Sequence, residues 1–367
     1  MNAWERRLRF KITYKAGKHR PRPSLSLVMA PRTHEQLVAN QTRPPPAVVT
    51  ADLSGKTLVL IGANTGLGFE AAKHFARMNP ARLVLTSRDE AKGKKALAQI
   101  EEDTGYTKAE LWIIDLTSFS SVIPFADKAE RELGRLDILV ENAGVVMWEY
   151  EQVEGWEKTM HTNNLGPGLL AIRLIPKMLE TARKHSVNPR LVVVASDTHY
   201  WTSIEKDVIA SPNILVKLSD KDYCTKEVMK RRYSDTKLLN VLFARALQSH
   251  VPTITVNSVN PGFCFSGLGS GAPPEEAERL EKMRKELAFT TEEGSRQIVY
   301  AAVGSPDDEE KLRGKYIHLS EVVEESDFVI SEDGKIVQDK VWEEMLEIFG
   351  KVDPKVPEVA KAHLAKA

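Results

Sequence analysis

Tyr233 and Lys237 are the pair of residues in this sequence best suited to proton transfer. They stand four positions apart in a segment whose apolar spacing predicts a helix over 226–249, so both side chains lie on one face of that helix. A nearby ammonium favours the phenolate form of a tyrosine. A free phenol has a pKa of about 10, and lowering it to about 7–8 takes roughly 3–4 kcal/mol of preferential phenolate stabilisation. We therefore expect Tyr233 to act as a general acid and base.

The spacing alone is a weak signal, because Tyr14 and Lys18 show it as well. Tyr14 lies in a basic stretch that precedes every predicted strand. Tyr233 instead opens an amphipathic helix, and it follows Ser196, which ends a buried strand predicted over 190–195. Position in the fold therefore selects Tyr233.

A glycine-rich turn follows the first predicted strand. Gly62, Gly66 and Gly68 stand between the strand 57–62 and the helix 66–78. Glycines there allow a sharp turn and a close approach of the backbone to a pyrophosphate, and the helix start offers free N–H groups to the anion. The pattern predicts a dinucleotide site that includes Leu67, with a tight turn without ligand as the alternative. Residues 54–57 form no P-loop, because they precede the strand and lack the upstream glycine.

The end of the second strand, 82–86, predicts which dinucleotide binds. An acidic residue there would accept a hydrogen bond from the ribose 2′-hydroxyl, whereas Ser87 followed by Arg88 suits a 2′-phosphate. We therefore expect NADP(H), with a solvated surface arginine as the alternative for Arg88. The positive charge of the nicotinamide would add to that of Lys237 in favouring the Tyr233 phenolate.

The elements that position these residues alternate between strands and helices from residue 56 onward. Strands are predicted at 57–62, 82–86, 110–114, 137–141, 190–195 and 253–259. Helices are predicted at 66–78, 90–102, 119–133, 155–184 and 226–249. Strands that are apolar throughout fit a parallel sheet covered on both faces. The fold class is α/β, a doubly wound parallel sheet of the Rossmann type.

Composition places limits on the class of protein. The 367 residues are 28% charged and 42% hydrophobic with two cysteines, which is typical of a globular, intracellular chain, and cytoplasmic localisation is expected. Residues 1–50 carry ten Lys and Arg against two acids, so the remainder has a net charge of −8 and gives no reason to bind nucleic acid. No apolar run is long enough for a transmembrane segment.

Three regions are expected along a single-domain chain. Residues 1–50 form a basic, Pro-rich and disordered extension, of which 1–28 could direct mitochondrial import or be absent from a protein that starts at Met29. Residues 51–320 form the NADP(H)-binding catalytic domain. Residues 321–367 form an appendage with a hairpin at 332–335 and a helix at 339–349, to which we assign no function.

Taken together, the motifs resemble those of the short-chain dehydrogenase/reductase family over about residues 55–320, and most closely its retinol-dehydrogenase-like members, particularly fungal ones. The matching positions are Gly62, Gly66, Gly68, Asp115, Leu116, Glu141 to Gly144, Asn163, Ser196, Tyr233, Lys237 and Asn260 to Gly262.

The resemblance implies a role for each position. Ser196 would bind the substrate carbonyl, Tyr233 would pass the proton, Lys237 would hold the ribose, and Asn163 would anchor a relaying water. The cofactor would also be bordered by Asp115, Leu116, Asn142, Gly144, Gly262 and Ser266. As alternatives, Ser196 is a turn residue, Asn163 a solvent-facing amide, Asp115 a loop acid, and Asn164 a rival for the amide role.

Several positions depart from the family pattern. Ile61 and Ser266 stand where threonine is usual, and Glu141 replaces the first Asn of N-N-A-G. The 37-residue interval from Ser196 to Tyr233 is longer than common and carries Tyr200, Trp201 and Tyr223, which could form a lid or substrate wall. None of these departures removes a catalytic atom.

The segment after Gly262 is expected to contact the substrate. Phe263 and Phe265 precede a Gly-rich stretch, 266–271, and a predicted helix over 273–287. Aromatic side chains and flexible glycines suggest a mobile cover over a lipophilic molecule, with ordinary surface packing as the alternative and packing as the expected role of Cys264. A helix to Val303 and a strand over 315–319 follow.

The function expected from these residues is reduction of a carbonyl, or oxidation of an alcohol, on a lipophilic small molecule that could be a secondary metabolite. Two other classes stay open. One is a non-catalytic NADP(H)-sensing module, and the other is an epimerase or dehydratase with a tightly held nicotinamide. The oligomeric state, monomer or homodimer, is left open.

Overall fold

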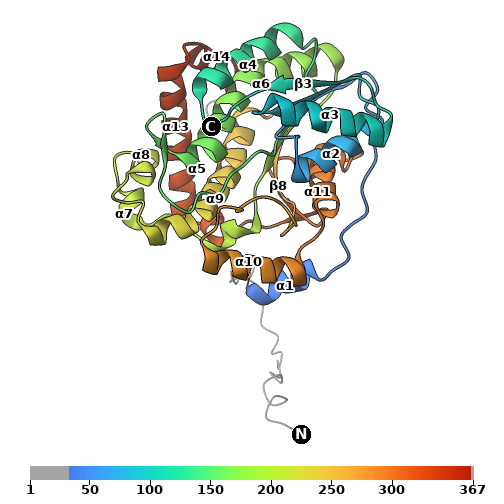
Figure 1. Cartoon of the computed structure of the whole chain (residues 1–367). Coiled ribbons are helices and arrows are strands. Elements are labelled where there is room, and N and C mark those ends of the chain that lie inside the picture. The colour runs from blue at the N-terminus through green and yellow to red at the C-terminus, as the bar shows by residue number, and fades with distance from the viewer. Residues whose placement is uncertain (1–32, 365–367) are drawn as a thin grey trace, which may run out of the picture. The chain divides into compact units, whose positions relative to one another are not determined.

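The computed structural model describes residues 33–364, which contain an eight-stranded sheet with helices on both faces (Figure 1). The strand order is β10-β9-β8-β7-β4-β1-β2-β3, parallel except for β10. The strands are β1 (Thr57–Ile61), β2 (Arg82–Ser87), β3 (Ala109–Ile113), β4 (Ile138–Glu141), β7 (Arg190–Val194), β8 (Thr255–Asn260), β9 (Tyr316–His318) and β10 (Glu321–Val323). The predicted doubly wound α/β sheet is confirmed.

Alternating side chains of the central strands explain why the strands are apolar throughout. In β1, Val59 and Ile61 pack into one buried cluster, and Leu58 and Leu60 pack into another on the opposite face. The chain order reverses between the neighbouring strands β1 and β4, and doubly wound sheets bind their ligands at the carboxyl ends of the strands at such a switch point. The glycine turn directly follows β1 at this switch point.

Two layers of helices cover the sheet (Figure 1). One face carries α2 (Gly66–Arg77), α3 (Glu90–Thr104) and α11 (Thr291–Val303). The other carries α4 (Phe119–Glu132), α6 (Gly166–His185), α9 (Lys226–His250), α13 (Glu332–Val352) and α14 (Lys355–His363). The longest of these, α9, delivers Tyr233 and Lys237 to the sheet.

The helix predicted over 155–184 differs from the structure at its start. A small hairpin of β5 (Gln152–Val153) and β6 (Trp156–Glu157) comes first. A short α5 (Lys158–Met160) and a π-helical turn, η1 (His161–Leu165), then lead into α6. Glu157 begins α5 by accepting from the N–H groups of Thr159 and Met160.

The inserted and peripheral elements are short. Between β7 and α9 lie η2 (Asp197–Trp201), α7 (Lys206–Ile209) and α8 (Ile214–Ser219). After β8 comes α10 (Pro274–Leu287), in which no residue is buried. The turn η3 (Glu309–Leu312) and α12 (Asp327–Ile330) complete the set.

The hairpin predicted at 332–335 is wrong. Those residues are the first turn of α13, whose N-terminus is capped by the Ser331 side chain. Gly334 lies so close to the carbonyl of Phe328 that a side chain there would overlap it, so this glycine serves packing and not a turn. The hairpin instead joins β9 to β10 through Leu319 and Ser320, which adopt φ values of 49° and 58°.

The C-terminal residues also belong to the core, and so they are no appendage. Val341, Met345 and Phe349 of α13 are buried in the cluster that covers one face of the sheet. The expected disorder of 1–50 is wrong for residues 33–50, which begin with α1 (His34–Gln41) and its Thr33 capping box. Residues 1–32, with Tyr14, Lys18 and Met29, lie outside the described residues.

Candidate active site

Ser196 and Tyr233 come together at the carboxyl end of β7. Ser196 follows the strand directly, and its hydroxyl caps η2 by accepting from the Thr198 N–H at 3.2 Å. The same hydroxyl shares a side-chain hydrogen bond with the phenol of Tyr233 on α9. Both side chains are half-buried, which leaves them open to a substrate.

Lys237 lies next to this pair, one turn further along α9. Its Nζ is 5.5 Å from the centre of the Tyr233 ring and donates to the Val194 carbonyl at 2.7 Å. The side chain is only 3% exposed, and this burial lowers the pKa of Lys237 to about 8. The predicted juxtaposition of Tyr233 and Lys237 is therefore present.

The expected lowering of the tyrosine pKa is not found in the protein alone. Burial raises the pKa of Tyr233 above its usual value, and the hydrogen bond with Ser196 opposes this effect only in part. Desolvation disfavours the phenolate form of Tyr233. It also lowers the pKa of Lys237, and so reduces the fraction of Lys237 that carries the positive charge expected to stabilise that phenolate. The protein alone thus holds the phenol protonated.

Asn163 occupies the π-helical turn η1 and faces the same site. Its Oδ1 accepts from the Val145 N–H at 2.8 Å, and its Nδ2 donates to the Val145 carbonyl at 3.0 Å and the Thr236 hydroxyl at 3.1 Å. A Cβ on Gly144 would lie 3.4 Å from Asn163 Oδ1 and 3.7 Å from Lys237 Nζ. Gly144, Asn163 and Lys237 therefore surround one small space.

Asn164 faces away from that space. Its Nδ2 donates to the Thr236 carbonyl at 2.9 Å and to the Asn240 side chain. The geometry thus favours Asn163 over Asn164 for the amide role. The Thr236 hydroxyl, which donates to the Tyr233 carbonyl at 2.7 Å, was missed by sequence reasoning because no motif marks it.

The glycine turn lies against the strand that leads to Gly144. Gly62 and Gly66 adopt φ values of 78° and 63°, which favour glycine. A Cβ on Gly68 would overlap the Gly62 carbonyl, to which Asn142 Nδ2 also donates at 2.8 Å. Thr65 at the start of α2 makes no capping hydrogen bond, so the first N–H groups of the helix stay available. This arrangement fits a pyrophosphate.

The residues expected at the adenosine end lie at the ends of β2 and β3. Arg88 is exposed, whereas Ser87 is buried and its hydroxyl donates to the Asp89 carbonyl at 2.8 Å. Asp115 Oδ1 accepts from the backbone and hydroxyl of Thr117 at 2.9 and 2.8 Å. The side chain of Leu116 is part of the core, so only its backbone could border a cofactor.

The loop after β8 supplies the remaining predicted positions. Gly262 has φ 85°, and Ser266 Oγ accepts from the Leu268 N–H at 3.3 Å in a local turn. Leu67 and Cys264 both lie close to Gly294 of α11, where a Cβ would meet the leucine at 2.9 Å and overlap the thiol. Burial raises the pKa of Cys264 to about 12, so its thiol stays protonated and serves packing.

A small cavity lies behind the site and contains Glu141, whose burial the sequence did not indicate. Its Oε1 and the Oδ1 of Asn164 are buried without a hydrogen-bond partner among the described residues. Burial raises the pKa of Glu141 well above its usual value. The departure from the family's N-N-A-G pattern was the signal that could have singled it out. The other lining residues are Ala143, Asn163, Asn164, Pro167, Gly168, Val193, Asn240, Phe243 and Met345.

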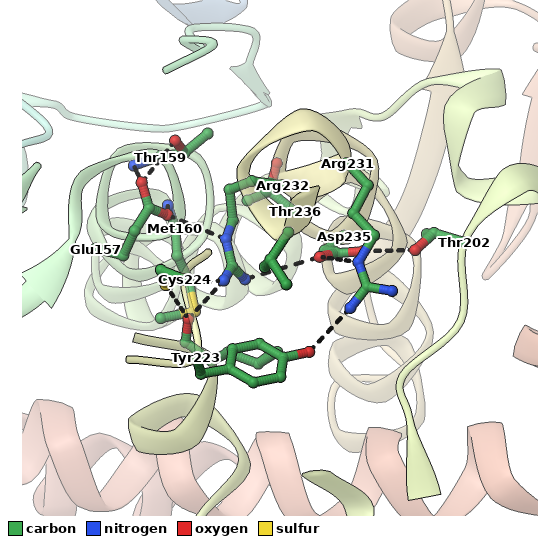
Figure 2. A network of polar contacts seen from close by, with 12 residues as sticks. Glu157, Thr159, Met160, Thr202, Tyr223, Cys224, Arg231, Arg232, Asp235 and Thr236 are labelled. Atoms are coloured by element: carbon green, nitrogen blue, oxygen red, sulfur yellow. Dashed lines mark hydrogen bonds and ion pairs between the residues drawn. The ribbon is translucent and has the colours of Figure 1, made fainter. Parts of the chain in front are cut away.

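The long interval between Ser196 and Tyr233 packs on α9 through a buried charge network (Figure 2). Arg232 lies between Glu157 and Asp235, with N–O distances of 3.5 and 3.8 Å. Tyr223 donates to Glu205 at 2.6 Å and accepts from Arg231 at 3.0 Å. Tyr223 thus belongs to this network, whereas Trp201 is 48% exposed.

Residues 33–364 contain neither a metal-binding cluster nor a membrane-spanning helix. Within that range, no group of three or more His, Cys, Asp or Glu side chains is arranged to hold a metal ion. None of the helices in the same range combines the length and the apolar character needed to cross a bilayer.

Comparison with known proteins gives this geometry a family context. Residues 56–200 match the family model for short chain dehydrogenases. The chain is 34% identical over 316 residues to the short chain dehydrogenase/reductase dmxR8 of Cryptosporiopsis sp., covering 84% of this chain and 94% of the relative. It is also 34% identical over 320 residues to the short-chain dehydrogenase anuD of Penicillium roqueforti, covering 84% and 81% of the two chains.

Solved structures agree at the level of the fold. A short-chain dehydrogenase/reductase from Brucella melitensis, described as a glucose/ribitol dehydrogenase, superposes with a TM-score of 0.54 at 22% identity and covers 73% of this chain and 96% of its own. With its dinucleotide turn, parallel sheet and fungal relatives, this chain belongs to the short-chain dehydrogenase/reductase family of nicotinamide-dependent oxidoreductases.

Proposed function

We propose that this protein is an NADP(H)-dependent carbonyl reductase, reversible as an alcohol dehydrogenase, that acts on a lipophilic small molecule. The observation that carries the proposal is the cluster of Ser196, Tyr233 and Lys237 at the carboxyl end of β7, which β4 alone separates from β1 and its glycine turn. This arrangement supports a proton donor, an oxygen-binding hydroxyl and a cation acting on a substrate next to a bound dinucleotide.

The proton chemistry follows from the environment of Tyr233. When bound, the nicotinamide supplies or accepts the hydride. In reduction, the Ser196 hydroxyl binds the carbonyl oxygen and the phenol of Tyr233 donates its proton to that oxygen. The raised pKa of Tyr233 keeps the phenol protonated, which suits a proton donor. Lys237 would hold the ribose and favour the phenolate left behind, and Asn163 would order the water that returns the proton.

The preference for NADP(H) rests on the turn after β2. Arg88 is exposed there, and no carboxylate pairs with it among the described residues. Asp89, the nearest acid, uses Oδ1 to cap α3 by accepting from the Lys92 N–H at 2.9 Å. A guanidinium offers the planar set of donors that a 2′-phosphate needs.

The proposal that the substrate is lipophilic rests on the loop after Gly262. Phe265 is 46% exposed and Leu268 is 37% exposed, although both side chains are apolar. They precede α10, in which no residue is buried. A loosely packed apolar cover next to the site suits an apolar molecule, secondary metabolites included. The likeness to retinol dehydrogenases stays a prediction.

The test is an assay of NADPH and NADH consumption with a panel of lipophilic aldehydes and ketones, in parallel for the wild type and Tyr233→Phe. We expect wild-type turnover with NADPH preferred, and a loss of about 10²- to 10⁴-fold in kcat for the variant with its fold retained. Full activity of Tyr233→Phe would show that the proton donor is another group. Cofactor binding without any turnover would instead favour a sensing module, and equal use of NADH would contradict the role of Arg88.

A further inference from the structure

Gln41, the last residue of α1, is buried on a helix whose other described side chains are largely exposed. It is 6% exposed, and Leu37 at 7% is the other buried one among the described side chains of that helix. The helix precedes the first strand of the sheet, and it lies beside the end of α10 (Figure 1). Burial of a polar side chain requires partners, because an unpaired amide would be costly to remove from water.

The partners of Gln41 lie more than 200 residues further along the chain. Its Nε2 donates to the carbonyl of Phe263 at 2.8 Å and to that of Leu287 at 2.9 Å. Its Oε1 accepts from the Phe263 N–H at 3.0 Å. Both amide protons and the amide oxygen are therefore used on backbone groups, which neither a carboxylate nor an apolar side chain could reproduce.

These two partners are the two ends of one excursion of the chain, residues 263–287. At its start, Gly262 has φ 85°, and a Cβ there would lie 2.8 Å from Gln41 Oε1. At its base, Cys264 and Phe289 form an isolated parallel β-bridge, in which the Phe265 N–H donates to the Phe289 carbonyl at 2.8 Å. A glycine is thus needed for the amide to approach the loop.

The rest of the excursion is held far less firmly than its base. α10 buries no residue, and Phe265 and Leu268 are among the exposed apolar side chains. Arg284 donates to the Leu268 carbonyl at 3.0 Å, but this bond lies within the excursion itself. The base therefore decides where the excursion lies beside the site.

We propose that Gln41 is a positioning residue for substrate binding, because it joins the two ends of the 263–287 excursion and so fixes the loop that carries Phe263 and Phe265 beside the active site. The effect on substrate rests on the proposed function, whereas the effect on the loop does not. Loss of the amide loosens the excursion and weakens binding of a lipophilic carbonyl compound, while Ser196, Tyr233 and Lys237 keep their places.

The experiment compares Gln41→Ala and Gln41→Glu with the matched control Asn40→Ala, the preceding position of α1. Gln41→Glu keeps the size of the side chain but removes both amide donors, so it stays informative if the alanine variant fails to fold. Amide hydrogen exchange over residues 263–289 is measured without cofactor or substrate. KM and kcat are then measured with NADPH and the lipophilic carbonyl compounds of the panel.

We expect exchange over 263–289 to rise by about tenfold in both Gln41 variants, and KM for the carbonyl compound to rise by roughly five- to tenfold with kcat within about twofold. Asn40→Ala should match the wild type in every measurement. Unchanged exchange over 263–289 would overturn the positioning role. A fall of roughly five- to tenfold in kcat with KM unchanged would overturn it as well. If the wild type turns over no compound while the exchange result holds, the proposed function fails and the anchoring of the loop stands.

Discussion

Two sides of α9 carry buried ionisable side chains, and they differ in whether these side chains have a partner of opposite charge. One side bears Arg231, Arg232 and Asp235 and faces the inserted segment after β7 (Figure 2). The other bears Tyr233 and Lys237 and faces the end of β7. The two sets alternate within a single helix, so the difference between them comes from their surroundings.

On the first side, each charge has an opposite charge nearby. Arg232 lies 3.5 Å from Glu157 and 3.8 Å from Asp235, and Arg231 pairs with Glu205. Glu157 also accepts from the Thr159 N–H at 2.8 Å and the Met160 N–H at 3.0 Å. Burial still raises the pKa of Asp235 to about 6, although Arg232 and Thr202 lower it in part. This side fastens the inserted segment to the helix.

On the second side, Lys237 has no carboxylate partner among the described residues, and its Nζ donates to the Val194 carbonyl at 2.7 Å. Its pKa is lowered to about 8 by burial alone. A buried cation without a counter-charge costs stability, and it is free to act on a bound substrate or cofactor. The comparison teaches that paired charges hold this fold together, and we propose that the unpaired Lys237 serves the chemistry.

The largest effect that sharpens this comparison is expected from Lys237→Met. We expect activity to fall by about 10²- to 10⁴-fold, because the cation that favours the phenolate is lost. The free energy of unfolding should nevertheless rise. The folded pKa lies below the unfolded value of 10.5, so the cost of burying this lysine grows as pH falls from 10.5 to about 8 and is fully present below 8.

Urea unfolding at pH 7 and at pH 11, together with the assay, measures both effects. The gain in stability should be present at pH 7 and absent at pH 11. A variant that is less stable than the wild type at pH 7 would show that Lys237 is a paired structural charge, and the contrast between the two sides would fail.

The next largest effect is expected from Arg232→Met on the paired side. Its removal leaves Glu157 buried without its cation and leaves Asp235 with Arg231 alone, at 3.7 Å, and we expect the free energy of unfolding to fall by about 3–5 kcal/mol. Activity per folded molecule should stay close to that of the wild type. The control is Lys230→Met on the same helix, where the solvent-exposed pair with Glu227 contributes little to stability. Equal stability of the two variants would contradict the structural role.

The smallest effect is expected from Glu141→Gln, which tests a buried acid without a counter-charge. The folded pKa of Glu141 lies well above the unfolded value of 4.5, so folding retains a proton that the unfolded chain releases. Stability of the wild type is therefore lost as pH rises above 4.5. The other residues that line the cavity do not ionise, so Glu141 is the group in this cavity that makes stability depend on pH.

The glutamine variant removes that dependence while it keeps the shape of the side chain. We expect it to match the wild type at pH 4 and to be more stable by about 1–3 kcal/mol at pH 8. Urea unfolding at the two pH values measures the difference. A variant that is less stable at pH 8 would mean that Glu141 is ionised and paired with a group other than those that line the cavity.

Much of the fold and of the site could be predicted from the sequence. Apolar runs such as 57–61 and 190–194 placed the central strands, because a strand covered on both faces must be apolar throughout. Ser196, Tyr233 and the glycine turn then came together, because the carboxyl ends of parallel strands meet at one edge. The prediction of a hairpin at 332–335 was wrong. Asp-Gly is typical of a turn, but Gly334 is needed for close packing of α13 against the Phe328 carbonyl.

The sequence by itself determined the sheet, the strand ends and the spacing of Tyr233 and Lys237, since these depend on periodicity and on bonds between near neighbours in the chain. The tertiary structure decided the rest. It raised the pKa of Tyr233, directed Asn163 to Val145 and Asn164 to Asn240, buried Glu141, and joined Gln41 to Phe263. Each of these depends on burial or on contacts between residues far apart in the chain, which no local pattern contains.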